Sequence, residues 1–256
     1  MIHPTAIVHP GARLDASVEV GAYSIIGEHV EVGQGTSIGP HAVIDGHTRL
    51  GRENRISPFS VIGGPPQDKK YAGEPTRLEI GDRNTIREYC TFSTGTLQDA
   101  GVTRIGSDNW IMAYCHIAHD CQIGDDIILA NNTQLAGHVI VQDFAVIGGF
   151  TGVHQFVRIG AHSMTGGGTM LRQDLPPYVT AAGNPPKTFG INAEGLRRRG
   201  YSEETIHGIT RAYKVIYRSG LTLADAQASI ATQAAELPAL RILAEFLAAA
   251  TRGIVR

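Results

Sequence analysis

The stretch from Val20 to Ile44 reads VGAYSIIGEHVEVGQGTSIGPHAVI and places an aliphatic residue at every sixth position. The same phase runs from Ile2 to Ile62 without a miss, and a phase shifted by one runs from Ile105 to Leu171 with Thr165 as its single polar member. A helix, with a period of about 3.6, or a simple strand, with a period of about 2, would scatter these residues over several faces. A short strand and a turn per hexapeptide would instead close one triangular coil every three repeats, so that residues 18 apart stack on neighbouring strands. The pattern predicts a mainly β protein built as a parallel β-helix.

Two interruptions of the repeat predict long loops. The gap from Ile62 to Ile80 spans 18 residues and keeps the phase, whereas the gap from Phe92 to Ile105 spans 13 residues and changes it. We therefore expect loops near residues 63–79 and 93–104. Long loops on a rigid scaffold commonly carry function.

The repeat ends in a proline-rich stretch, which predicts a boundary between two domains. Residues 1–186 would form the β-helix, and residues 187–256 a small helical domain. Ser202 and Thr222 are suited to cap helices, and Pro238 to start a third one that ends near Gly253.

Charge and composition exclude several classes of protein. The chain has 22 Lys and Arg against 24 Asp and Glu, so it lacks the basic field of a nucleic-acid binder. It has no run of 18 apolar residues and no basic, apolar leader at its start, so we expect no integral membrane segment and a cytoplasmic location. The three cysteines, Cys90, Cys115 and Cys121, all fall at the small inward position of the repeat, which favours reduced, structural thiols.

The 18-residue spacing also predicts two neighbouring columns of outward residues at one corner of the triangle. They are His119, Gly137 and Gln155 in one column, and Asp120, His138 and Phe156 in the other. A histidine beside a carboxylate, with a bare glycine amide above it, can accept a proton and let a substrate approach the backbone. A hydrated turn with a chance His-Asp pair explains the same residues. A third alternative is zinc held between subunits by histidines of the central coils, as in the gamma-class carbonic anhydrases that share this architecture.

Several sequence motifs of this chain resemble those of a known enzyme family. The hexapeptide pattern resembles that of the left-handed parallel β-helix acyltransferases, and the left-handed coil is implied by that resemblance alone. HIAHDC at 116–121, LAGHV at 135–139, VHQF at 153–156, KYAGEPTR at 70–77 and EGLRRRGYS at 194–202 resemble the UDP-N-acetylglucosamine O-acyltransferase family, which catalyses the first step of lipid A synthesis. The sequence departs from the usual Ile-His-Arg of the family at Phe92-Ser93-Thr94.

The resemblance implies an activity and a catalytic set. The family transfers an (R)-3-hydroxyacyl chain from acyl carrier protein to the 3-hydroxyl of UDP-N-acetylglucosamine. His119 would be the general base, Asp120 would hold and polarise it, and the amide of Gly137 would receive the oxyanion. No metal or organic cofactor would be required.

The resemblance also implies a binding set and an assembly. Substrate would be bound by Asp68, Lys70, His116, His138, His154, Gln155, Asn192, Glu194, Arg198 and Arg199, although His116 could equally support its neighbours. Gly167 would lie where the family sets acyl length. The family forms homotrimers with sites at the subunit interfaces.

Two further classes remain open at this stage. A related N-acyltransferase of the same pathway would act on an amine, but it carries an extra N-terminal uridine-binding domain, for which a repeat that starts at Ile2 leaves no room. A purely structural solenoid would bind no nucleotide sugar.

Overall fold

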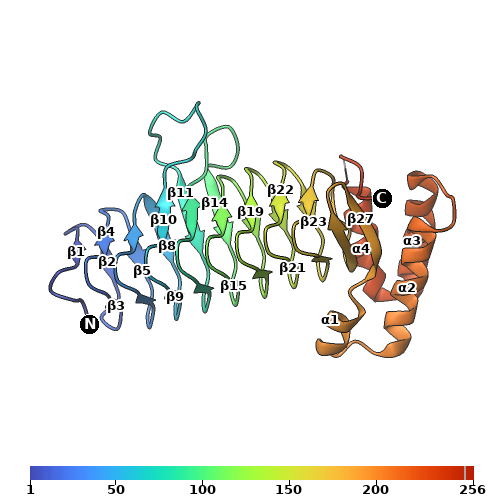
Figure 1. The fold of residues 1–256 in the computed structure, drawn as a ribbon, viewed down its shortest axis with the longest axis horizontal. Helices are drawn as coiled ribbons and strands as arrows, with labels where there is room; N and C mark the ends of the chain where they lie inside the picture. The colour runs from blue at the N-terminus through green and yellow to red at the C-terminus, as the bar shows by residue number, and fades with distance from the viewer. Residues whose placement is uncertain (251) are drawn as a thin grey trace.

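The computed structural model describes residues 1–250 and 252–256, and its main body is a triangular prism of short parallel strands (Figure 1). The first sheet consists of β1 (Ile7–Val8), β4 (Ile25–Ile26), β7 (Val43–Ile44), β10 (Val61–Gly64), β13 (Thr91–Ser93), β16 (His116–Ile117), β19 (Gln134–Leu135), β22 (Gly152–Val153) and β25 (Met170–Leu171). The second sheet consists of β2 (Arg13–Leu14), β5 (Glu31–Val32), β8 (His47–Leu50), β11 (Arg77–Ile80), β14 (Val102–Ile105), β17 (Gln122–Ile123), β20 (Ile140–Val141) and β23 (Arg158–Ile159). The third sheet consists of β3 (Glu19–Val20), β6 (Ser37–Ile38), β9 (Arg55–Ile56), β12 (Thr85–Ile86), β15 (Trp110–Ile111), β18 (Ile128–Leu129), β21 (Val146–Ile147), β24 (Met164–Thr165), β26 (Val179–Gly183) and β27 (Pro186–Ile191).

The strand register confirms the predicted stacking of residues 18 apart. Ile117 pairs with Leu135, and Leu135 pairs with Val153, in a parallel ladder. All three side chains point inward and are at most 4% exposed. Each buried aliphatic side chain of this kind contributes about 1.5–3 kcal/mol, so the inner ladder is the main source of stability.

Thr165, the polar member of the ladder, is buried because its hydroxyl is hydrogen-bonded. Its Oγ1 accepts from the Gly148 amide at 2.9 Å and lies 3.1 Å from Oγ1 of Thr151. A buried hydroxyl that is paired in this way avoids most of the cost of leaving water.

Both predicted loops leave the prism at the same corner. Residues 65–76 connect β10 to β11, and residues 94–101 connect β13 to β14, so each loop lies between the first and second sheets. Figure 1 shows the two loops side by side above the middle of the prism. They join each other through the hydrogen bond between Oγ1 of Thr76 and Oγ1 of Thr94 at 3.1 Å, and the second loop also bonds to Arg77 at the start of β11.

The C-terminal part consists of a hairpin and a set of helices. Strand β26 pairs in parallel with β24 and antiparallel with β27, and the helices are α1 (Ala193–Arg198), α2 (Glu203–Tyr217), α3 (Leu223–Glu236), a 3-10 turn at Pro238–Leu240 and α4 (Arg241–Ala248). Ser202 and Thr222 cap α2 and α3 as predicted, whereas α4 ends at Ala248, short of Gly253. The hairpin runs across position 186, and the first helix begins at Ala193, so the division into domains 1–186 and 187–256 stays a prediction. In the described part of the chain, none of the helices has the length and apolar character needed to cross a bilayer.

Candidate active site

The corner between the first and second sheets carries the predicted columns. His119 and Asp120 occupy the turn between β16 and β17, and Gly137 and His138 occupy the turn one coil further on. The His138 amide donates to His119 O at 3.0 Å, and the Phe156 amide donates to Gly137 O at 3.1 Å. Backbone hydrogen bonds between coils therefore fix the height of each side chain above its neighbour.

His119 and Asp120 form a hydrogen-bonded pair. Nδ1 of His119 lies 2.9 Å from Oδ2 of Asp120, and the two side chains are 15% and 1% exposed. Because Nδ1 is bonded to the carboxylate, Nε2 is the ring nitrogen that a substrate can reach. A carboxylate on Nδ1 fixes the ring in the tautomer that presents an Nε2 lone pair.

Gly137 is buried directly against the ring of His119. A methyl group on Gly137 would lie 2.5 Å from Cε1 and 2.7 Å from Nε2 of His119. Only glycine leaves room for the imidazole at this position, because contacts this short are repulsive for carbon.

His138 lies between two carboxylates. Its Nδ1 is 2.8 Å from Oδ2 of Asp99 in the 94–101 loop, and its Nε2 is 3.9 Å from Oδ2 of Asp120. Its ring stacks on Phe156 at 4.4 Å and meets the His119 ring edge-on at 5.1 Å. These contacts hold His138 beside His119 and Asp120.

Two cavities meet at His119. The first, of about 560 Å³, lies on the outer face of the first sheet, where Met170 and Ala136 give apolar side chains while those of Leu135, Val153 and Leu171 stay buried in the core behind it. The second, of about 850 Å³, lies under the loops and is lined by Gln67, Asp68, Lys69, Lys70, Gln98, Asp99, His119, His138, Gln155 and Phe156. His119 therefore separates a mainly apolar compartment from a polar one.

His116 and His154, both predicted to bind substrate, line the apolar cavity. Nδ1 of His116 is 2.8 Å from Oγ1 of Thr91, and burial lowers the pKa of His116. Nδ1 of His154 is 3.1 Å from Gln155 O. Thr91 precedes the Phe92-Ser93-Thr94 departure, and the hydroxyls of Thr94 and Thr76 are hydrogen-bonded to each other at 3.1 Å.

A second group of predicted residues lies at another corner of the prism, between the second and third sheets. Asn192 caps α1 and its Nδ2 donates to His162 O at 3.1 Å, while the Arg199 guanidinium lies over the Phe144 ring at 4.1 Å. Glu194 and Arg198 pair with each other at 3.1 Å. None of these four predicted residues lines either cavity beside His119. The single chain therefore divides the predicted binding residues between two separate places.

Gly167 belongs to neither group. It lies at the third corner, ahead of β25, and the nearest atom to a methyl group added there would be Gly149 O at 3.5 Å. A side chain would fit at this position in the single chain, and Gly167 lines neither of the two cavities.

The sequence interpretation missed residues that belong to the site. Gln67 lines both cavities, Thr96 donates hydrogen bonds to Asp120, and Asp99 bonds to His138. All three lie in the loops, and the hexapeptide rule says nothing of the conformation of a segment that leaves the repeat.

The zinc alternative corresponds to one group of side chains in the described chain. His119, Asp120 and His138 offer ligand atoms that lie within 4.8 Å of one another. However, Oδ2 of Asp120 is already hydrogen-bonded by Thr96 and His119. The carboxylate is thus held as a hydrogen-bond acceptor, which suits acid–base chemistry.

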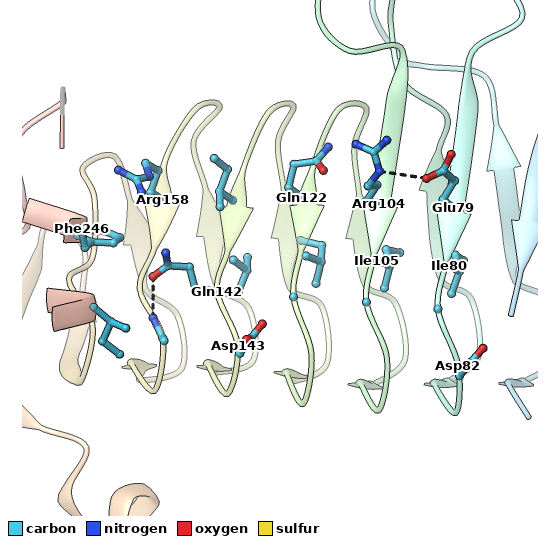
Figure 2. Close-up of a pocket in the computed structure, with 18 of the residues that line it drawn as sticks. Glu79, Ile80, Asp82, Arg104, Ile105, Gln122, Gln142, Asp143, Arg158 and Phe246 are labelled. Carbon is cyan, nitrogen blue, oxygen red and sulfur yellow. Dashed lines mark hydrogen bonds and ion pairs between the residues drawn. The ribbon is translucent and has the colours of Figure 1, made fainter. Parts of the chain in front are cut away.

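A third cavity lies on the second sheet, away from His119. It has a volume of about 960 Å³ and extends along the sheet to α4 (Figure 2). Its charged and polar side chains are largely paired with their own neighbours: Arg104 with Glu79 at 3.0 Å, and Gln142 with the Ala161 amide at 3.1 Å. It contains no histidine or cysteine and none of the predicted site residues.

Comparisons with known proteins identify the class. Residues 103–137 match the family model described as bacterial transferase hexapeptide (six repeats). Residues 174–255 match the model described as UDP-N-acetylglucosamine O-acyltransferase, domain 2. The fold and these matches define a hexapeptide-repeat acyltransferase.

Relatives over the full length specify the family. The chain is 60% identical to the acyl-[acyl-carrier-protein]–UDP-N-acetylglucosamine O-acyltransferases of Herminiimonas arsenicoxydans and Thiobacillus denitrificans, with 100% of this chain and 99% of each relative covered. The solved structure of LpxA from Acinetobacter baumannii is 47% identical, covers 100% of this chain with 99% of its own, and superposes with a TM-score of 0.97. The chain belongs to the UDP-N-acetylglucosamine O-acyltransferase family, and its β-helix is left-handed, as the resemblance implied.

Proposed function

We propose that this protein transfers an (R)-3-hydroxyacyl group from acyl carrier protein to the 3-hydroxyl of UDP-N-acetylglucosamine, the first step of lipid A synthesis. The names of its full-length relatives state both substrates for those proteins. The observation that carries the proposal is the place of His119, at the boundary between an apolar cavity and a polar one with its Nε2 available. An acyl thioester and a nucleotide sugar need such a pair of compartments.

The geometry supports a general-base mechanism. Nε2 of His119 removes the proton from the sugar hydroxyl as that oxygen attacks the thioester carbon. The resulting oxyanion accepts a hydrogen bond from the Gly137 amide, and collapse of the intermediate forms the ester and expels the carrier thiolate, which receives the proton from His119. Acid–base help contributes typically about 10²–10⁴ in rate, and one oxyanion donor about 10²–10³. Asp120 stabilises the imidazolium that forms between the two proton transfers.

In this proposal each cavity holds one substrate. Ala136 and Met170 offer apolar contacts to the acyl chain in the smaller cavity. Asp68, Lys70 and Gln155 offer polar contacts to the nucleotide sugar in the larger one, where the ammonium of Lys70 suits a diphosphate. His116 and His154 line the apolar cavity beside His119, where the thioester would lie.

A homotrimer explains the divided binding residues. Asn192, Glu194, Arg198 and Arg199 lie at a different corner from His119, so in this proposal they complete the site of a neighbouring copy. Cyclic threefold assembly suits a three-sided prism, because each subunit presents one corner to each neighbour. Gly167, which has no side chain, would leave room for a longer acyl chain.

The proposal includes a location and a cofactor requirement. A reaction between a carrier-protein thioester and a nucleotide sugar belongs in the cytoplasm, where both substrates are made. The chemistry of His119, Asp120 and Gly137 is complete without a metal or an organic cofactor.

Incubation with UDP-N-acetylglucosamine and 3-hydroxyacyl carrier protein tests the proposal. We expect mass spectrometry to find the O-acylated nucleotide sugar both with and without a chelator, and His119→Ala to abolish it while circular dichroism stays unchanged. Absence of product with the unmodified protein contradicts the proposed reaction. Loss of product in the chelator arm alone would favour the zinc alternative instead.

A further inference from the structure

The carboxylate of Asp120 is held mainly by one residue outside the repeat. The Thr96 amide donates to Oδ1 at 2.9 Å and to Oδ2 at 3.1 Å, and the Thr96 hydroxyl donates to Oδ2 at 2.6 Å. Oδ2 is also the atom that lies 2.9 Å from Nδ1 of His119. Thr96 thus gives both of its donors to the carboxylate that orients the catalytic ring.

Thr96 is itself fixed in place. It is 1% exposed, and its carbonyl accepts hydrogen bonds from the amides of Asp99 at 3.3 Å and Gly101 at 3.1 Å. The loop is therefore a compact turn closed around Thr96, and Thr96 is buried inside it.

The return strand holds the other side of Asp120. The Asp120 amide donates to Oγ1 of Thr103 at 2.8 Å. Asp120 is only 2% exposed, so it depends on protein groups rather than water for its hydrogen bonds. Residues 96–103 contact both the backbone and the side chain of this one residue.

These contacts set the rotation of the carboxylate. A carboxylate can turn about its last torsion, and that torsion is broad in the absence of partners. The two backbone bonds and the hydroxyl bond from Thr96 define one rotation, and in that rotation Oδ2 faces His119. Hydrogen bonds to a charged group are roughly twice as strong as those between neutral groups, so this rotation is strongly favoured.

We propose that Thr96 is a positioning residue of the transfer reaction, which acts by fixing the Asp120 carboxylate against Nδ1 of His119. This inference rests on the proposed function. It assigns a task in the reaction to the 94–101 loop that is distinct from substrate contact.

Thr96→Val is the central variant, because it removes the hydroxyl and keeps the shape of the side chain and the backbone donor. We expect kcat to fall about tenfold or more, since the bond to a charged acceptor is lost, while KM for both substrates stays within about twofold. Thr96→Ser restores the hydroxyl and is expected to restore kcat to within about threefold of the unmodified protein.

Thr36→Val is the matched control. Thr36 is also fully buried and its hydroxyl donates to Gly51 O at 2.9 Å, but it lies in the N-terminal coils, far along the chain from His119. We expect it to lower the melting temperature as much as Thr96→Val and to leave kcat unchanged. An equal loss of kcat in both variants would mean that Thr96 has only a structural role.

A double-variant cycle tests whether Thr96 acts through Asp120. Once Asp120→Ala has removed the carboxylate, adding Thr96→Val should change kcat by less than about twofold. If the two substitutions lower kcat independently, so that their fold-losses multiply, the inference is overturned.

A crystal structure of Thr96→Val gives a readout that does not depend on activity. We expect the carboxylate of Asp120 to be rotated away from Nδ1 of His119, and an unchanged His119–Asp120 contact would contradict the inference. Failure of the unmodified protein to transfer acyl groups would instead contradict the proposed function, and the structure would still test the positioning.

Discussion

A methyl group on Gly137 would lie 2.5 Å from Cε1 of His119, so the glycine and the imidazole occupy adjoining space one coil apart. The ring cannot move freely to avoid such a group, because Nδ1 is bonded to Asp120. The position of the proposed base is thus set from two sides: by a hydrogen bond within its own coil and by the bare backbone of the next.

The first prediction concerns this contact. Gly137→Ala should lower kcat by about 10² or more, because displacement of a catalytic group by about 1 Å is enough for such a loss. Steady-state kinetics would measure it. Gly64→Ala is the control, since a methyl group there would meet only Cγ1 of Val61 at 3.5 Å, and we expect it to retain activity. Full activity of Gly137→Ala would show that His119 does not act from the observed position.

The second prediction concerns the divided binding residues. His119→Ala and Arg199→Ala should each be inactive alone, but mixed trimers should recover activity, because some sites would combine an intact His119 with an intact Arg199 from a neighbour. Random mixing of equal amounts would restore about one quarter of the sites in a cyclic trimer. Refolding or co-expression of the two variants, followed by the transfer assay, would measure it. No recovery would indicate that both residues serve the same site from the same chain.

The third prediction concerns Asp99. Asp99→Asn should keep an oxygen that can accept the bond from Nδ1 of His138, but it removes a negative charge from the polar cavity. We expect KM for the nucleotide sugar to fall about twofold to fivefold at low salt, because a diphosphate would be repelled less, and kcat to stay unchanged. The difference should shrink as salt is raised. A rise in KM would show instead that the carboxylate contacts the substrate favourably.

The fourth prediction concerns acid stability. Burial, followed by the charge of Arg199, lowers the pKa of His162 to about 4. The folded protein therefore binds fewer protons at His162 than the unfolded chain between the ordinary pKa of histidine, about 6.5, and this lower value. The free energy of unfolding should fall as the pH is lowered through that interval, and the contribution of His162 should be fully present only above it.

His162→Phe isolates this contribution. Phe144 and Phe156 have the same positive φ as His162, at 64°, 66° and 59°, so phenylalanine is compatible with the backbone there. The variant loses the contact of Nε2 with the Tyr201 hydroxyl, worth about 1 kcal/mol at neutral pH, but it should lose less stability on acidification. Urea unfolding at pH 7, 5.5 and 4.5 would show the free energies of unfolding of the variant and the unmodified protein approaching each other as the pH is lowered. If the free energy of unfolding falls equally with pH in both proteins, His162 is not the source of the acid sensitivity.

The repeat predicts the scaffold closely because its information is local and redundant. Each aliphatic residue of the ladder marks an inward position in its hexapeptide, so the 18-residue spacing alone predicts that Ile117 stacks on Leu135. The corner proposed as the active site follows from the same count, since His119 and Gly137 are 18 residues apart. The helix caps at Ser202 and Thr222 could be predicted because capping depends on residues within one turn.

What the sequence could not provide lies where the chain leaves the repeat. The bonds from Thr96 to Asp120 and from Asp99 to His138 span 24 and 39 residues and depend on the path of a loop. The division of the binding residues also escaped prediction. Whether Arg199 meets His119 of its own chain depends on how the prism ends, and here Arg199 packs on Phe144 at a different corner.

The inner ladder continues beneath the two loops, with Ile80 in register with Leu50 and Ile117 in register with Phe92, although β10 and β13 change register between Ile62 and Gly64. The inner ladder that keeps the molecule folded is therefore separate from residues 65–76, whereas residues 94–101 are tied to the coil through Thr96 and Asp120. Grafting residues 65–76 from a relative should move preference between sugars or acyl groups while the melting temperature hardly changes. Such an arrangement lets substrate selectivity change at this corner without any change in the packing of the inner ladder.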